Sequence, residues 1–413
     1  MNREANVFET QQDADFKAEL SPREQYVERR AQLERHLLDN PLAVQEIRHE
    51  EPEAGGAKVR VSMGRFDIPD NLKREGESGV IRIAIFVPGT FETDPPAFAN
   101  QPLEAKLISG LVTGRVDNVY VLKAEGLNKQ AYLDKDNNSR VESFVAEDAT
   151  KILQKSLEEL RQKAQQQTGY SADAPRVEID IVGYSEGSTQ AASIAAKIHE
   201  MGLGKVSSYT SIGGAGFTGF ETQKDANLPD LFKHNLGVKS ELSNHPVFME
   251  KGLPVAKGTH VSAVEGEDTL LVNSRVLSGD KRGGGLEGSL GNAKRSEVSL
   301  LSDMRNVSVW IGRLISTEFG SKEEVPYERL RAEFTRNPDL KKLVEYKIPM
   351  VVTAGLKDAL FPGEDVRQTV EGLRKEGAKI ALAVIDAGHG FYHENPQGTA
   401  ALVHSMKEKF KIV

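Results

Sequence analysis

Val177-Glu-Ile-Asp-Ile-Val-Gly-Tyr-Ser-Glu-Gly187 is the stretch that decides the fold, and it runs into the small-residue stretch Ser188-Thr-Gln-Ala-Ala-Ser-Ile-Ala-Ala-Lys197. The β-branched first part predicts a strand, and the alanine-rich part predicts a helix. Between them, Ser185 stands in the pattern G-x-S-x-G. A sharp strand-to-helix turn crowds the backbone on both sides of such a serine, so both flanking positions require glycine. The context therefore predicts that Ser185 is a nucleophile raised above the edge of a sheet.

A serine nucleophile of this kind needs an acid and a base further along the chain, in the order Ser, Asp or Glu, His. Residues 347–355 read as a strand, and Asp358 lies in the loop that follows. Residues 379–385 read as the next strand, and His389 follows it between two glycines. The two loops are about one α-β unit apart, so they should be neighbours on a parallel sheet. We therefore expect Asp358 to hold His389, and His389 to act as the base.

Three nearby residues compete for these roles. Glu364 and Asp365 lie further along the loop of Asp358 and are alternative acids. His393 lies just beyond His389 and is an alternative base, although it lacks the flanking glycines.

A fourth element concerns the stabilisation of an oxyanion. Residues 79–87 form the most continuous apolar run, as expected for a strand buried on both faces, and lead into Pro88-Gly-Thr-Phe91. A loop at this place can donate the backbone N–H of Thr90 beside that of Glu186. The competing interpretation is an ordinary strand-ending turn, which Pro-Gly also favours.

Together, Pro88-Gly-Thr90, Gly183-Tyr-Ser-Glu-Gly187, Asp358 and Gly388-His-Gly390 resemble the α/β-hydrolase superfamily in order and spacing. The resemblance covers about residues 78–413, apart from a poorly matching interior. It implies an α/β fold with a mostly parallel sheet of eight strands flanked by helices.

The same resemblance implies serine-dependent hydrolysis of an ester, with a Ser185–His389–Asp358 triad and an oxyanion hole at Glu186 and Thr90. A carboxylesterase or lipase is the leading expectation. A lactonase, a thioesterase, a peptidase and a catalytically silent binding protein on the same fold are the alternatives. The pattern Pro-Gly in place of His-Gly before the oxyanion residue departs from many relatives and leaves the subfamily open.

The chain divides into four expected parts. Residues 1–43 form an N-terminal extension, whose helix begins near Ser21 and either packs on the body or serves as a dimerisation arm. Residues 44–216 and 306–413 form the two parts of the hydrolase core. In residues 217–305 the strand-helix alternation breaks down, and in α/β-hydrolases the corresponding insertion is a cap or lid.

Aromatic residues near the expected site are candidates for contact with substrate. They are Phe91, Tyr184, Phe217 and Phe391. For Phe217, which opens the expected cap, a place in the cap's own core is an equally good interpretation.

Composition narrows the classes of partner. A net charge of −8 argues against nucleic-acid binding, and the absence of cysteine excludes disulfides, thiolate metal sites and cysteine catalysis. Residues 134–138 resemble the start of a calcium loop but lack its glycine and its bidentate glutamate. We therefore expect no metal and no cofactor. No signal peptide or membrane-spanning run appears, which predicts a cytoplasmic location.

Overall fold

The computed structural model describes fourteen stretches of the chain, which are residues 22–39, 43–50, 56–73, 79–89, 102–126, 131, 141–168, 175–218, 233–235, 237–245, 247, 261–263, 268–273 and 336–412. Within them, one sheet of ten strands runs in the order β1-β2-β4-β3-β5-β6-β9-β10-β8-β7. The strands are β1 (Ala43–Glu50), β2 (Lys58–Asp67), β3 (Val80–Val87), β4 (Asn118–Gly126), β5 (Arg176–Tyr184), β6 (Lys205–Ile212), β7 (Val261–Ala263), β8 (Thr269–Val272), β9 (Met350–Gly355) and β10 (Ile380–Ile385).

The sheet is mostly parallel. Every pairing from β4 through β3, β5, β6, β9 and β10 to β8 is parallel. The antiparallel pairings lie at the two ends, where β1 and β2 lead into β4 and where β7 pairs with β8. The sheet and its flanking helices confirm the predicted fold class.

The strand count corrects the expectation of eight strands, because the hairpin β7–β8 extends the sheet beyond β10. The register places Val272 of β8 opposite Ile385 of β10. This hairpin lies inside residues 217–305, so that part of the predicted cap belongs to the sheet. The apolar run Thr269–Val272 is fully buried there, and pairing with β10 satisfies its backbone. The remaining division into core and cap stays a prediction, since most of residues 217–305 lie outside the described stretches.

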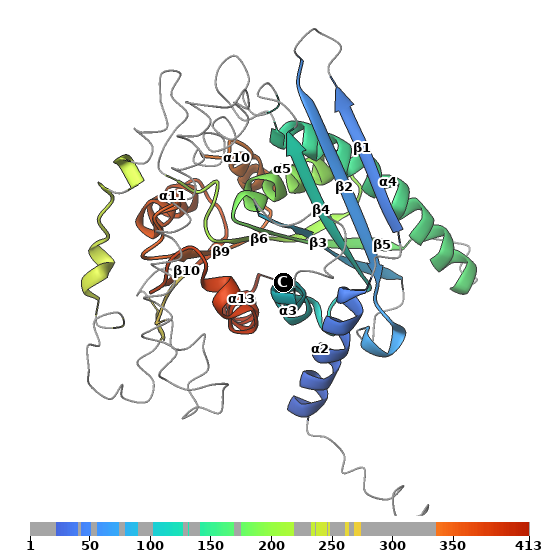
Figure 1. Ribbon diagram of the computed structural model, residues 1–413, viewed down its shortest axis with the longest axis horizontal. Coiled ribbons are helices and arrows are strands. Elements are labelled where there is room, and N and C mark those ends of the chain that lie inside the picture. Colours follow the sequence, from blue (N-terminus) through green and yellow to red (C-terminus); the bar gives the residue numbers. More distant parts are fainter. Residues whose placement is uncertain are drawn as a thin grey trace, which may run out of the picture.

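Helices cover both faces of the sheet (Figure 1). They are α2 (Pro22–Leu38), α3 (Pro102–Val112), α4 (Val141–Thr168), α5 (Glu186–Glu200), α10 (Asp339–Glu345), α11 (Gly363–Lys375), α12 (Phe391–Glu394) and α13 (Pro396–Lys409), with short 3₁₀ turns at Asp70–Leu72 and Glu241–Asn244. The buried residues of α4, α5, α10 and α11 belong to a core on one face of the sheet. Those of α2, α3 and α13 belong to a second core on the other face.

The alternation of side chains along a buried strand produces these two cores. In β3, Ile83 and Ile85 join the core under α4 and α5, whereas Ala84 and Phe86 join the core under α3 and α13. A strand between two apolar layers has no polar face, which explains the continuous apolar run in the sequence.

The N-terminal helix α2 packs on the body of the protein. Leu33 and Leu37 are buried in the core shared with α3. The Tyr26 hydroxyl donates to the carbonyl oxygen of Gly110 over 3.3 Å, and His36 Nε2 lies 3.0 Å from the carbonyl oxygen of Asp67. The predicted helix is confirmed, and these contacts agree with the interpretation that it packs on the body. Among the described helices, none combines the length and apolar character that crossing a membrane requires.

Candidate active site

The turn between β5 and α5 places Ser185 in a strained backbone conformation, with φ of 50° and ψ of −134°. Only close packing keeps a non-glycine residue in this region. A Cβ on Gly187 would lie closer than 3.0 Å to the carbonyl oxygens of Val87 and Pro88, and one on Gly183 would meet the backbone of Gly187 equally closely. The two glycines of the motif therefore allow three backbone segments to meet beneath the serine.

Ser185, His389 and Asp358 form a continuous hydrogen-bonded row. Ser185 Oγ lies 3.0 Å from His389 Nε2, and His389 Nδ1 lies 2.7 Å from Asp358 Oδ2. All three residues are buried, with exposed fractions of 9%, 7% and 4% in the order Ser185, His389, Asp358. When Nδ1 carries the proton, Nε2 is free to accept the serine proton.

The loop after β9 holds the carboxylate of Asp358 in place. Its Oδ1 accepts hydrogen bonds from the backbone amides of Leu360 and Phe361 over 2.8 and 2.9 Å. This leaves Oδ2 directed at His389. The Phe361 ring also lies against the imidazole, with ring centroids 5.3 Å apart.

Backbone hydrogen bonds join the acid loop to the loop of His389. The amide of Leu356 donates to Ile385 over 2.7 Å, and that of Lys357 donates to Ala387 over 3.0 Å. An ion pair of 2.7 Å between Lys357 and Asp386 spans the same loops. The spacing of one α-β unit thus places the loops of Asp358 and His389 side by side, as the sequence predicts.

The alternative acids and base have other partners. Asp365 Oδ2 lies 2.6 Å from His234 Nε2, and His393 Nε2 lies 3.3 Å from Glu104. Burial opposes the charge of Glu364, but hydrogen bonds from Arg367 and Ser240 lower its pKa below the ordinary value. Among the candidates, Asp358 and His389 are the pair in line with Ser185.

The helix amide proposed for the oxyanion belongs to Glu186, the first residue of α5 and the neighbour of the serine. The second predicted donor, Thr90, lies outside the described residues. The residue before it is in place, because a Cβ on Gly89 would lie 2.9 Å from Cβ of Ser185. Gly89, the residue that precedes the predicted donor, is therefore close to Ser185.

The aromatic residues expected to contact substrate lie in the cores. Tyr184 is 1% exposed, and its ring contacts those of Phe86 and Tyr392. Phe217 is fully buried and stacks on Tyr209, and Phe391 is 2% exposed. These positions favour a structural role for the three residues, and contact with substrate stays a prediction. Phe91 lies outside the described residues.

Gly213, at the end of β6, is a site residue that the sequence reasoning did not assign. It has a φ of 88°, and a Cβ there would lie 3.2 Å from Cε1 of His389. Its amide donates to Thr353 of β9 over 2.9 Å, and the amide of Ser185 donates to Ile212 over 2.9 Å. The Gly213-Gly214 pair directly after a buried strand was the available signal for a backbone that passes close to a functional side chain.

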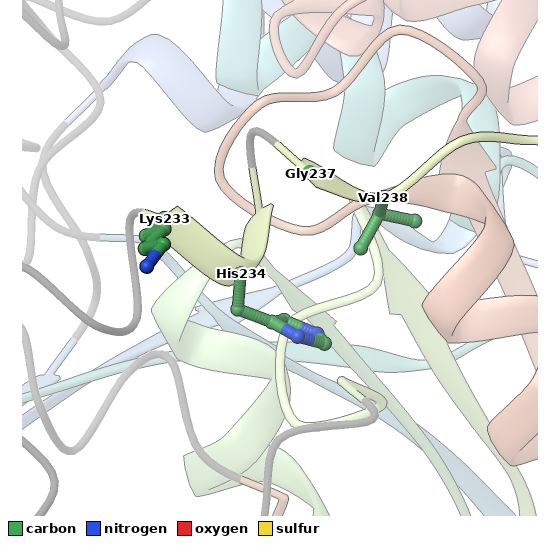
Figure 2. Close-up of a pocket in the computed structure, with 4 residues that line it drawn as sticks. All are labelled: Lys233, His234, Gly237 and Val238. Carbon is green, nitrogen blue, oxygen red and sulfur yellow. The ribbon is translucent and has the colours of Figure 1, made fainter.

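A cavity of about 520 Å³ is lined by Lys233, His234, Gly237 and Val238. Figure 2 shows these residues along one short stretch of chain. No group of three metal-ligating side chains occurs among the residues that the structure describes.

No protein-family model and no curated protein matches the sequence. Among solved structures, a hyperthermophilic esterase from the archaeon Pyrobaculum calidifontis is similar at 13% identity, over 94% of this chain and 92% of that one, with a TM-score of 0.39. A thermophilic esterase from Thermogutta terrifontis is similar at 14% identity (89% and 99% covered, TM-score 0.37). A bromoperoxidase from Bacillus anthracis is similar at 13% identity (88% and 100% covered, TM-score 0.38).

The mostly parallel sheet, the strained turn from β5 into α5 and the chain order of the hydrogen-bonded row are the features that the sequence resemblance implies. By these features, the protein has the α/β-hydrolase fold.

Proposed function

We propose that the protein is a serine hydrolase that cleaves carboxylic esters through an acyl-enzyme intermediate. The observation that carries this proposal is the row from Ser185 Oγ through His389 to Asp358, with spacings of 3.0 and 2.7 Å. These distances are within the reach that a general base and its orienting carboxylate require. The strained backbone turn at Ser185 adds a second support.

In the first half of the reaction, Ser185 Oγ attacks the carbonyl carbon of the ester while His389 Nε2 takes the hydroxyl proton. Asp358 stabilises the imidazolium that results and keeps its proton-bearing Nδ1 in place. The tetrahedral oxyanion accepts from the amide of Glu186 and, in this proposal, from that of Thr90. When the bond to the leaving oxygen breaks, His389 gives its proton to the departing alcohol.

In the second half, water replaces the alcohol. His389 removes a proton from that water as the water oxygen attacks the acyl carbon, and it then returns the proton to Ser185 Oγ as the acid leaves. No other group is needed to balance the steps.

Residues 217–305, apart from β7 and β8, are proposed as a cap over the acyl chain. Each methylene that it buries contributes about 0.8 kcal/mol, so such a cap would set the preference for chain length. A panel of p-nitrophenyl esters of increasing chain length measures this preference directly. Equal kcat/KM across the panel would count against a cap that covers the acyl chain.

The deciding experiment is labelling by a fluorophosphonate probe together with ester hydrolysis. We expect the wild-type protein to be labelled, and Ser185→Ala to lose the label and at least about three orders of magnitude in kcat/KM. Ser193→Ala is a matched control, because Ser193 is a second buried serine, on α5, that donates to the carbonyl oxygen of Thr189. It should label and hydrolyse as the wild type does.

A wild-type protein that neither labels nor hydrolyses would favour the catalytically silent alternative. Turnover of lactones, thioesters or peptides without turnover of open-chain esters would keep the triad and change the substrate class.

A further inference from the structure

A short segment outside the triad is bound to the acid loop. It consists of residues 233–235 and 237–240, and we call it the brace. His234 lies 2.6 Å from Asp365, and Ser240 donates to Glu364 over 2.9 Å, so the brace is tied to the first turn of α11. Figure 2 shows part of the brace beside its cavity. Between these two ties lies Asn235.

Asn235 reaches the loop that carries the proposed acid. Its Nδ2 donates to the carbonyl oxygen of Leu360 over 2.8 Å, and the side chain is buried, with 6% of the residue exposed. The carbonyl of Leu360 and the amide of Phe361 belong to the same peptide unit. That amide donates to Asp358 Oδ1 over 2.9 Å.

Two consequences follow from this shared peptide unit. The hydrogen bond from Asn235 fixes the plane of the unit, since rotation of that plane would break the bonds at both ends. It also polarises the unit, which strengthens the bond that the Phe361 amide makes with the carboxylate. The hydrogen-bonded row thus extends from Asn235 through the peptide and Asp358 to His389 and Ser185.

We infer that Asn235 is a positioning residue, which orients the carboxylate of Asp358 toward His389 through the peptide unit between Leu360 and Phe361. This inference rests on the proposed function for its kinetic consequence, but its geometric consequence can be measured without any turnover. Removal of the side-chain donor leaves a buried carbonyl oxygen without that partner and frees the peptide to rotate.

The chain offers a matched control in Asn273. It is also 6% exposed, and its Nδ2 donates to the backbone carbonyl of Val247 over 2.9 Å. Asn273→Ala therefore removes an equivalent buried hydrogen bond that is not directed at the peptide unit beside Asp358.

The experiment compares Asn235→Ala, Asn235→Asp and Asn273→Ala in the full chain. We expect Asn235→Ala to lower kcat by about tenfold or more while KM changes by less than about twofold, because orientation of the acid matters mainly during the chemical step. Asn235→Asp keeps the shape but puts an oxygen opposite the carbonyl oxygen, and should lose at least as much. Asn273→Ala should stay within about twofold of the wild type.

Proton NMR provides the readout that is independent of activity. A proton held in the short bond between His389 and Asp358 gives a far-downfield signal, assigned by its loss in His389→Gln. The short His234–Asp365 pair is separated from it with His234→Gln. We expect the His389 signal to shift or broaden in both Asn235 variants and to persist in Asn273→Ala.

The outcomes separate this inference from the proposed function. A wild-type protein without hydrolysis or labelling overturns the function, yet the NMR comparison still decides the role of Asn235. An unchanged His389 signal with unchanged kcat in a folded Asn235 variant overturns the positioning role. So does a failure of both Asn235 variants to fold while Asn273→Ala folds, because Asn235 would then be a structural residue.

Discussion

The two sides of the candidate active site are held by different forces. On the nucleophile side, Ser185 is fixed by backbone segments that pass too close for any side chain at Gly183 or Gly187. On the acid and base side, Asp358 and His389 are fixed by directed hydrogen bonds from amides and side chains. The first kind of restraint is steric and the second is polar.

This difference predicts how each side responds to substitution. A steric restraint fails abruptly, because a few tenths of an ångström of overlap forces the backbone to move. A polar restraint weakens in steps, since each lost hydrogen bond leaves the others in place. The nucleophile side should therefore respond to a single added methyl group, whereas the acid side should show graded losses that are largest at the carboxylate and smaller with distance from the reacting atoms.

The largest effect is expected at the acid itself. Asp358→Asn replaces the acceptor of His389 Nδ1–H with a group that can donate, so the imidazole is held in the wrong tautomer. We expect kcat/KM for a p-nitrophenyl ester to fall by about three orders of magnitude or more with the fold intact. Circular dichroism and thermal denaturation check the fold.

Asp365→Asn is the control for this substitution. Asp365 is the neighbouring carboxylate bound to His234, and its amide variant should change kcat/KM by only a few-fold. If the two variants exchanged these effects, Asp365 would be the acid.

A smaller effect is expected on the nucleophile side from Gly187→Ala. The new Cβ would lie closer than 3.0 Å to two backbone carbonyl oxygens, and neither can move as a flexible side chain does. We expect a loss of about 1–3 kcal/mol in the free energy of unfolding and of roughly a hundredfold in kcat/KM. Chemical denaturation and ester hydrolysis measure the two. A variant with wild-type stability and activity would show that this side is not sterically restrained.

The two sides of the site also differ in how they could be predicted from the sequence. The motif around Ser185 is local, so the strained turn and its glycines were readable directly from residues 183–187. The pairing of Asp358 with His389 was readable from topology, since parallel strands one α-β unit apart place their loops together. The contacts that other parts of the chain make with these loops could not be predicted from the sequence.

Asn235 illustrates why. It lies 125 residues from Leu360 in the sequence. The residues around it show no hydrophobic periodicity of a strand or helix that would predict the contact. The burial of the aromatic residues was not readable for another reason, because hydrophobicity beside a candidate nucleophile does not tell which face of the strand a side chain occupies. Tyr184 is next to the serine and yet turns into the opposite core. Likewise, Thr269–Val272 is too short a run to distinguish a strand of the sheet from part of a cap.

A third prediction concerns the loss of folding stability at acid pH, which does not depend on the chemistry of the site. His404 lies on α13, and burial, with the charge of Arg115 as a second cause, lowers its pKa to about 4. Lys407 acts in the same direction, whereas Asp180 and the hydrogen bond with Gly110 oppose it. His404 belongs to neither the nucleophile side nor the acid and base side of the site.

The sign follows from linkage. The unfolded chain binds a proton on His404 below its ordinary pKa, while the folded chain does not until about pH 4, so stability falls as pH decreases between these values. At pH 5 the loss should be about 2 kcal/mol. In His404→Gln, the drop in unfolding free energy from pH 7 to pH 5 should be smaller by about that amount. An equal drop in both proteins would contradict a half-buried histidine that stays neutral at pH 5.

The smallest effect is expected from Gly372→Ala. This variant is a control for Gly187→Ala, because it adds the same methyl group without steric crowding. Gly372 and Gly187 are both helical glycines, but a Cβ on Gly372 of α11 would have no atom within 4 Å. Alanine restricts the unfolded chain and favours the helix at both positions, so only the crowding differs between them. We expect Gly372→Ala to raise the free energy of unfolding by roughly 0.5–1 kcal/mol with unchanged kcat/KM. Urea denaturation of both variants gives the comparison. A destabilisation at Gly372 similar to that at Gly187 would mean that helix glycines in general resist substitution here, and the steric account of the nucleophile side would lose its support.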